Sequence, residues 1–347
     1  MSSLLEDRYR QVLRLLPADY RQAWEEDMVA SFLEAAHTAA PDDPEGVEIS
    51  RPTLAETASI AALAVRLRLG GAGAAPRPFA WGEAVRRFAL VGLLAHAIGG
   101  LFGIVLAFWT VEQLPGAMPL TDTQPLFPSR WVALWSLSGL LWLPAYLAAV
   151  HGRHRAARVI AAVAFLPGLV GAIGRMTGDT SGVDIPQRVS WLVFDLLPVL
   201  ALVAFGPDSP PMRARPWHLA LPAGVALTVA VLLAADPRLG QDVHLLPLVD
   251  WPGLWCAGLL GLAVAHWSIE RTRRSPVWPL TLVLLVAPVL VLRLVTLIDY
   301  VRFAASTDDA TVPASIGTIQ CVVLLAIGAA MAGVAARRLR AETLTAG

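Results

Sequence analysis

Long uninterrupted runs of apolar residues recur through residues 88–335 and restrict this chain to a helical membrane architecture. A helix needs roughly 20 apolar residues to cross the hydrocarbon of a bilayer. Because the runs lack the alternation of membrane β-barrel strands, each one predicts a helix. The sequence therefore predicts an all-α, polytopic helical membrane protein with about eight transmembrane helices. The predicted spans are residues 88–111, 131–150, 158–174, 189–205, 217–235, 250–267, 278–298 and 313–335.

Arginine is concentrated on every second connection between the predicted spans, and this pattern predicts an orientation. Short cytoplasmic loops carry an excess of basic residues. The arginine-rich connections contain Arg66, Arg68, Arg77, Arg86, Arg87, Arg153, Arg155, Arg158, Arg213, Arg215, Arg271, Arg273, Arg274, Arg337, Arg338 and Arg340. The other connections carry mainly acids, namely Glu112, Asp122, Asp179, Asp184, Asp236, Asp242, Asp308 and Asp309. We expect both termini to be cytoplasmic.

Composition favours a multi-pass protein of a bacterial cytoplasmic membrane. All 27 residues counted as Lys or Arg are arginines, and Ala, Gly and Pro are abundant, a composition associated with high-GC bacterial genomes. The N-terminus lacks the pattern of a cleavable signal peptide, so we expect the first span to be an uncleaved anchor. Residues 66–87 form a basic stretch suited to anionic lipid. Outside this stretch the sequence has no basic face and no interleaving of aromatic and basic residues, so it gives no indication of nucleic-acid binding.

Residues 1–69 predict a small cytosolic three-helix domain. Leu5, Tyr9 and Leu13 recur at helical spacing, and Pro17 ends the first helix. Asp19 is the expected N-cap of the second helix, and residues 41–46 have the composition of a loop. A capping box over residues 53–56 opens the third helix. Residues 70–87 are a linker and basic juxtamembrane segment, residues 88–335 the membrane domain, and residues 336–347 a cytosolic tail.

The apolar and aromatic residues of the first two helices form a candidate partner-binding face. Its members are Tyr9, Tyr20, Trp24, Met28 and Phe32. Three short helices bury little surface, so packing against another protein or against the membrane domain would stabilise them. Two interpretations stay open: a cap on the membrane domain, or an interaction domain that binds a cytosolic protein.

The same segment carries a family resemblance. Tyr9-Arg10, Leu13-Arg14-Leu15-Leu16-Pro17 and Tyr20-Arg21 are followed by Trp24-Glu25-Glu26-Asp27-Met28 and Phe32. This order resembles the permease-prefix segment that precedes the membrane part of many bacterial permease-like integral membrane proteins. The resemblance covers about the first 35 residues and implies a bacterial membrane protein. The large extracytoplasmic domain of macrolide-exporter-type permeases is absent from the chain, so transport activity does not follow from the resemblance.

Charged residues inside the predicted spans are candidates for function, because a central Arg or Asp costs roughly 2.5–3.5 kcal/mol on insertion scales. Asp195 and Arg293 lie at similar depth near the external side. They could form a direct ion pair, face a wet cavity together, or be separate with Arg293 extended toward the interface. Asp299, Asp250 and Glu112 lie at external span ends and could complete a polar vestibule, or be ordinary interfacial residues.

Other polar and sulfur groups suggest no enzymatic chemistry. His96 is the one histidine well inside a span, and a lone histidine there is most simply a hydrogen-bonded packing residue. Cys256 and Cys321 lie within spans, where cysteine packs as a small apolar residue. No P-loop, zincin, nucleophile-elbow or kinase motif occurs, so we expect no enzyme, no metal and no cofactor.

The sequence thus leaves two functional hypotheses. The first is a non-enzymatic membrane protein, permease-like or regulatory, whose residues 1–69 bind a partner. The alternative is a secondary transporter of a small solute or ion that uses an external vestibule around Asp195 and Arg293. The sequence identifies neither a solute nor an oligomeric state.

Overall fold

The computed structural model describes residues 4–41, 43–71, 73–110, 137–178, 185–206, 214–234, 246–269, 275–304 and 311–346. Every regular element within these ranges is a helix, which confirms the all-α prediction. The chain divides into two compact units. The N-terminal unit consists mainly of Met1–Glu83, and the membrane unit consists of Ala84–Phe205 with Pro210–Ala341.

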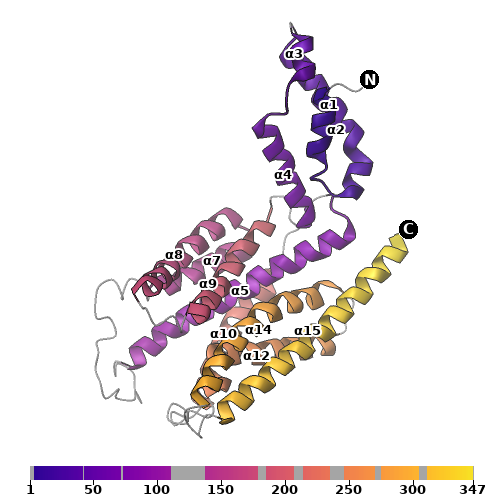
Figure 1. Ribbon diagram of the computed structural model, residues 1–347. Helices are drawn as coiled ribbons and strands as arrows, with labels where there is room; N and C mark the ends of the chain where they lie inside the picture. The colour runs from indigo at the N-terminus through magenta and orange to yellow at the C-terminus, as the bar shows by residue number, and fades with distance from the viewer. Residues whose placement is uncertain are drawn as a thin grey trace. The chain divides into compact units, whose positions relative to one another are not determined.

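Four helices build the N-terminal unit (Figure 1): α1 (Leu4–Leu13), α2 (Ala18–Ala39), α3 (Pro44–Ile49) and α4 (Leu54–Arg68). Their apolar sides meet in one core that contains Tyr9, Leu13, Leu16, Val29, Ile60, Ala64 and Leu67. Leu13 and Leu67 are almost completely buried. The helical spacing of Leu5, Tyr9 and Leu13 therefore identified the inward face of α1 correctly.

Two local predictions in this unit are wrong. Residues 44–49 form α3 where a loop was expected up to residue 46. The Asp43 carboxylate accepts a hydrogen bond from the Gly46 amide at 2.9 Å, and Pro44 begins the helix with a φ angle suited to it. Asp19 is not the N-cap of α2, because the helix already begins at Ala18 after Pro17, which makes no side-chain cap bond.

The predicted start and end of α4 are confirmed. The Thr53 hydroxyl accepts from the Glu56 amide at 3.2 Å, and the Glu56 carboxylate accepts from the Thr53 amide at 2.6 Å. This reciprocal pair satisfies two amides that the helix leaves unpaired. At the other end Gly70 has a φ of 75°, and the Gly71 amide donates to the Arg66 carbonyl at 2.8 Å.

The membrane unit is built from α5 onward. In Figure 1, α5 is one continuous ribbon from Pro76 to Thr110, and its first residues belong to the N-terminal unit. The helices that follow are η1 (Gly139–Leu141), α7 (Trp142–Val150), α8 (His154–Gly178), α9 (Ile185–Ala201), η2 (Leu202–Ala204), α10 (Ala214–Ala234), α11 (Leu246–Val249), α12 (Trp251–Ser268), α14 (Val277–Ala304) and α15 (Thr311–Ala346).

Among the described residues, five helical segments are long and apolar enough to cross a membrane, so the chain is a multi-pass membrane protein. They are Pro76–Gly103, His154–Gly174, Ile185–Ala204, Val277–Arg302 and Thr311–Ala341. The other three predicted spans overlap the shorter apolar helix Gly139–Val150 and the helices α10 and α12. A count of eight spans stays a prediction.

The outer side of α8 shows the expected lipid-facing character. Five large apolar residues at spacings of four and three are exposed along it: Val159, Val163, Leu166, Val170 and Ile173. Only 22% of the most apolar window of this helix is buried within the protein. An apolar stripe of this length suits hydrocarbon and would promote association in water.

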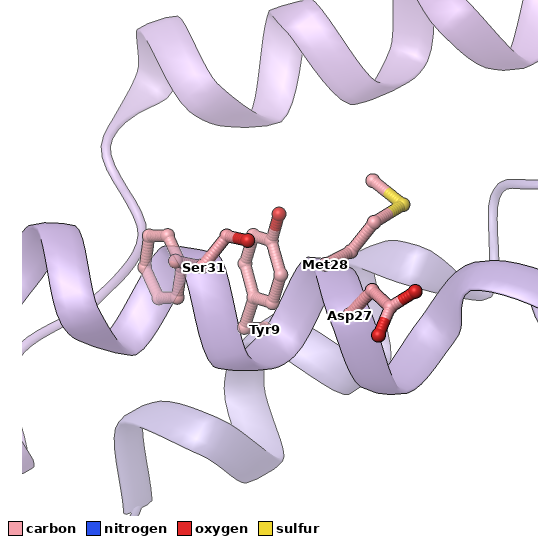
Figure 2. Close-up of a pocket in the computed structure, with 5 residues that line it drawn as sticks. Tyr9, Asp27, Met28 and Ser31 are labelled. Carbon is pink, nitrogen blue, oxygen red and sulfur yellow. The ribbon is translucent and has the colours of Figure 1, made fainter.

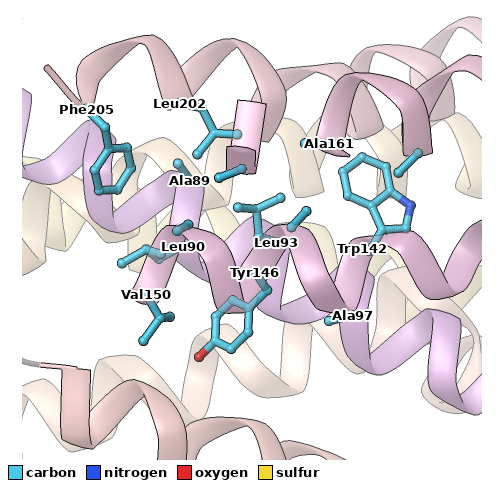
Figure 3. Packing of buried hydrophobic residues seen from close by; sticks show 14 of the residues in the cluster. Ala89, Leu90, Leu93, Ala97, Trp142, Tyr146, Val150, Ala161, Leu202 and Phe205 are labelled. Atoms are coloured by element: carbon cyan, nitrogen blue, oxygen red, sulfur yellow. The ribbon is translucent and has the colours of Figure 1, made fainter. Parts of the chain in front are cut away.

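Two apolar cores hold the membrane unit together, and α5 contributes to both. One contains Leu90, Leu93, Trp142 and Tyr146 from α5 and α7 together with residues of α8 and η2 (Figure 3). The hydroxyl of Tyr146 donates to the Trp217 carbonyl of α10 at 2.6 Å. The other core joins Phe88 of α5 to residues of α9, α12, α14 and α15. Helix α5 therefore contributes buried residues to both cores, and residues of α9 also pack against both.

One glycine makes a close helix contact possible. A Cβ atom on Gly100 would lie 2.2 Å from the Gly139 carbonyl oxygen, so α5 and η1 meet at a point where no side chain fits. Gly103 has open space where its Cβ would be. Close packing along this part of α5 thus involves Gly100, and also Gly99, whose Cβ would lie 2.8 Å from the Trp251 ring.

Two arginines of the basic connections bind the end of α9 and η2. The Arg158 guanidinium donates through Nε to the Leu202 carbonyl at 3.2 Å and through Nη2 to the Phe205 carbonyl. Arg86, which is fully buried, donates to the Ala204 carbonyl at 3.4 Å. Carbonyls at a helix C-terminus lack partners within the helix and carry partial negative charge, so both arginines stabilise this end.

Candidate functional site

Two separate clusters of polar side chains lie among the described residues of the membrane unit. The larger one surrounds Arg293, which lies on α14 and is completely buried. Its guanidinium makes five hydrogen bonds, and the strongest electrostatic one joins Nη1 to Asp250 Oδ2 at 2.7 Å. The remaining bonds reach the Gln320 side chain, the Pro247 carbonyl and the Thr296 hydroxyl. Every donor direction of the guanidinium is therefore used within the protein.

Asp250 has two roles in this cluster. It is the N-cap of α12, where Oδ1 accepts from the Gly253 amide at 2.7 Å and a proline follows in the first turn. Its second oxygen binds Arg293 and also accepts from the Tyr300 hydroxyl at 2.9 Å. The sequence Asp-Trp-Pro-Gly at the start of α12 thus fixes the carboxylate that neutralises the buried arginine.

Gln320 connects the cluster to α15. Its Oε1 accepts from Arg293, and its Nε2 donates to the Pro247 carbonyl at 3.0 Å. The cluster consequently joins α11, α12, α14 and α15 through one charge-neutral network. Because its hydrogen-bonding capacity is filled internally, this network suits a structural role more than the binding of a charged ligand.

The smaller cluster consists of His96 on α5 and Asp195 on α9. His96 Nε2 lies 2.9 Å from Asp195 Oδ1, and His96 Nδ1 lies 2.7 Å from the Gly92 carbonyl oxygen. The imidazole ring also contacts the aromatic rings of Trp142 and Phe194, with centroid distances of 4.5 and 6.0 Å. The His96 side chain is 10% exposed and the Asp195 side chain 36%. An ionisable pair thus links two apolar helices.

Of the three arrangements left open for Asp195 and Arg293, the direct ion pair does not form. Each residue has a different partner, His96 for the aspartate and Asp250 for the arginine. Similar depth in the sequence does not determine which way each residue points around its helix axis, and these two point to different neighbours.

The remaining candidates of the predicted vestibule have different outcomes. Asp250 does meet Arg293. Asp299 lies on α14 next to Tyr300 and has its own interaction. Glu112 lies outside the described residues. Of the five candidates, the structure therefore brings only Asp250 and Arg293 together among the residues it describes.

Sequence reasoning missed three partners in these clusters. His96 was interpreted as a lone packing histidine, and Gln320 and Tyr300 received no role. A polar amide in the last span was an available signal, because an intramembrane polar side chain needs a partner. Nothing in the sequence indicated that His96 and Asp195, 99 positions apart, would meet.

In the N-terminal unit the candidate partner-binding face divides into two parts. Figure 2 shows Tyr9, Asp27, Met28 and Ser31 around an open depression of about 390 Å³, which Phe32 also lines. A second depression of about 250 Å³ is lined in part by Tyr20 and Trp24. The five candidates therefore do not form one continuous surface pocket.

Exposure distinguishes the members of this face. Tyr9 is 7% exposed and stacks on Phe32 at a centroid distance of 3.9 Å, so it belongs to the core. Burial, and then the nearby charge of Glu56, raise the pKa of the Tyr9 hydroxyl above its ordinary value. Trp24 is 52% exposed. Trp24 is therefore the large aromatic side chain most available to a partner.

Ion pairs hold α1 against α2 beside this face. Arg10 contacts Glu6 at 2.9 Å on its own helix and Glu26 at 2.8 Å on α2. The hydrogen bonds that Arg10 donates to Glu26 are the larger cause, and the arginine charge the smaller cause, of a lowered pKa of the Glu26 carboxyl. The same pairs raise the pKa of Arg10. Arg10 thus neutralises acidic residues of both helices.

Metal-binding residues do not gather in the part of the chain that the structure describes. Within it, no group of three His, Cys, Asp or Glu side chains could hold an ion. Cys256 and Cys321 are both buried free thiols. The ring of His151 lies 4.8 Å from that of His218, and the ring of His154 lies beside Phe205.

Comparison of the whole chain with known proteins assigns no family and no function to it. No protein-family model, no curated protein and no solved structure matches it.

Proposed function

We propose that this chain is a non-enzymatic protein of the bacterial cytoplasmic membrane, permease-like or regulatory, whose N-terminal unit binds another protein. In this proposal eight helices cross the membrane, both termini are cytoplasmic, and residues 1–69 form a cytosolic domain. The alternation of arginine-rich connections supports the orientation. The resemblance of residues 9–32 to the permease-prefix segment supports the class of protein.

The observation that carries the proposal is an independent helical core with an exposed aromatic side chain. The N-terminal unit packs its own apolar residues around Leu13 and Leu67, yet it leaves Trp24 half exposed. Tryptophan is enriched at the energetic centres of protein interfaces. Glu25 and Glu26, which follow Trp24 in the sequence, are paired with Arg10, so an apolar pocket that receives the tryptophan is the feature we expect of a partner.

Affinity purification of the full-length protein from its native membrane tests this proposal. A specific soluble protein should co-purify, and Trp24→Ala should reduce its recovery at least tenfold. Leu54→Ala is the matched control, because Leu54 is also apolar and is 89% exposed on a different helix. Deletion of residues 1–69 should abolish recovery. The same co-purifying proteins with and without residues 1–69 would overturn the proposal.

A secondary transporter is the second candidate, and the His96–Asp195 pair favours it. Ionisable residues between membrane helices commonly mark ion or proton pathways. Solute or proton flux in reconstituted vesicles, lost in Asp195→Asn, would support this candidate over a purely partner-binding role. Flux equal to that of protein-free vesicles for a broad panel of solutes would count against it.

A further inference from the structure

The imidazole of His96 contacts two oxygen atoms of different kinds. One is the Gly92 carbonyl oxygen, which can only accept a hydrogen bond, and the other belongs to the Asp195 carboxyl, which can accept or, when protonated, donate. The Gly92 carbonyl can only accept, so Nδ1 must carry a hydrogen for the 2.7 Å contact to be a bond. Two other described histidines, His37 and His151, make the same contact with the carbonyl four residues earlier. This common contact fixes the tautomer but not the total charge of the ring.

The second contact of His96 sets the number of protons. An ionised carboxylate only accepts, and the Nε2 atom of a neutral ring with hydrogen on Nδ1 also only accepts. The 2.9 Å contact between Nε2 and Asp195 Oδ1 therefore needs one further hydrogen. That hydrogen lies either on Nε2, giving imidazolium and carboxylate, or on Oδ1, giving imidazole and carboxylic acid. Both forms have zero net charge.

We propose that His96 and Asp195 together form a binding site for one exchangeable proton within the membrane unit. Release breaks one N–H or O–H bond and transfers the proton to water, leaving a neutral imidazole and a carboxylate. The two lone pairs then face each other across the α5–α9 contact, so release weakens that contact. The Asp195 side chain is 36% exposed and the His96 side chain 10%, so the carboxyl is the more accessible member of the pair.

The surroundings hold the pair without supplying another charge to it. Trp142 and Phe194 contact the ring of His96. Besides the pair itself, the ionisable groups on α5, α9 and the helices packed against them are Arg77, Glu83, Arg86, Arg87, Tyr146, His154, Arg155, Arg158, Arg175, Arg188, Arg215, His218, Cys256, His266, Arg293, Asp299, Tyr300 and Arg302. Among the described residues, Asp195 is the one ionisable group that contacts the His96 ring. Arg293, on the helix α14 that packs against α9, is bound by Asp250.

A spectroscopic pH titration of the full-length protein in lipid nanodiscs tests this site. The ring nitrogens of His96 are followed by nitrogen NMR, and the Asp195 carboxyl is followed by infrared difference spectroscopy. In the wild-type protein both signals should change in one common step, because interacting groups titrate as a pair. In Asp195→Asn, the His96 step should move by at least one pH unit, a tenfold change in proton affinity.

The choice of variants separates proton binding from loss of structure. An asparagine at 195 can donate from its amide to Nε2, so the α5–α9 contact is kept while the exchangeable proton is removed. His96→Phe keeps an aromatic ring beside Trp142 and should displace the Asp195 carboxyl step. His151→Gln is the matched control and should leave both His96 and Asp195 unchanged. Independent titration of His96 and Asp195, or a His96 step that ignores Asp195→Asn, would overturn the proposal.

Proton binding at this site does not depend on the partner proposed for the N-terminal unit. A common titration step in a protein that captures no partner would support the site and oppose the proposed function. Capture of a partner by a protein with independent titration steps would do the reverse.

Discussion

Arg293 illustrates how one fully buried charge is accommodated among apolar helices. A buried cation without partners would cost several kcal/mol, and pairing alone does not always compensate for desolvation. Here the carboxylate of Asp250, the amide of Gln320 and the carbonyl of Pro247 supply acceptors from three other elements. The position of these acceptors around one guanidinium explains why arginine, with its planar fork of donors, occupies this position.

This network leads to a stability prediction. Arg293→Met should destabilise the protein by about 3–5 kcal/mol, because it leaves the Asp250 carboxylate buried without its cation. Asp250→Asn keeps an N-cap side chain for α12 and strands the arginine instead. The double variant should lose less than the sum of the two single losses. Unfolding measured in one lipid or detergent system checks the cycle, and strictly additive losses would show that the two residues act separately.

Pairing between helices is the part of the site that the sequence could not provide. Composition and depth identified Asp195, Arg293 and Asp250 as residues that need partners. The partners depend on the rotation of each helix about its axis, and a difference of one residue turns a side chain by about 100°. That rotation is set by the packing of apolar surfaces such as Phe194 against Trp255, which no local pattern records.

Helices and their ends were predicted with varying success for physical reasons. Long apolar runs and the capping box at Thr53 report directly on helix formation, so α4, α8, α14 and their neighbours were expected. The short helix α3 was missed because Pro, Asp and Gly are as typical of a turn as of a first helical turn. Helix α5 begins at Pro76, earlier than the predicted span at residue 88, because hydropathy locates the apolar part of a helix and not its start.

The contact between α5 and η1 gives a prediction with opposite signs at two neighbouring glycines. Gly100→Ala should destabilise the protein by about 1–3 kcal/mol, because its Cβ would overlap the Gly139 carbonyl and force the helices apart. Gly103→Ala meets no such neighbour and should be neutral or stabilising by up to about 1 kcal/mol, because alanine favours the helix. Thermal unfolding of the two variants checks this, and equal effects would contradict the close approach.

At the scale of the whole molecule, two kinds of surface are combined in one chain. The N-terminal unit carries charged pairs such as Arg10 with Glu26 on its outside. The membrane unit exposes apolar stripes such as the one on α8. A charged surface suits water and an apolar surface suits lipid. The division near Glu83 therefore coincides with a change from a surface suited to water to one suited to hydrocarbon.

The predicted orientation can be tested by cysteine accessibility. Cys256 and Cys321 are first replaced by alanine, and single cysteines are then introduced at Asp122, Asp179, Asp242 or Asp308. A membrane-impermeant thiol reagent should label these four positions in intact cells, because they lie on acidic connections expected outside. Cysteines at Arg153, Arg213 or Arg273 should react only after the membrane is opened. Labelling of Arg273→Cys from outside in intact cells would contradict the predicted orientation or the predicted count of eight spans.

The arginines that bind the end of η2 have a consequence for how the protein is made. Arg158 belongs to one of the arginine-rich connections that we predict to be cytoplasmic, and any cation would satisfy the charge pattern on which that prediction rests. Its bonds to the Leu202 and Phe205 carbonyls require donors separated as they are in a guanidinium. We therefore expect an Arg158→Lys variant to insert with the same orientation but to lose one of the two hydrogen bonds to the Leu202 and Phe205 carbonyls, and so to be less stable. We therefore expect the sidedness of insertion and the packing at the end of η2 to depend on the same side chain, and the lysine variant to separate the two effects.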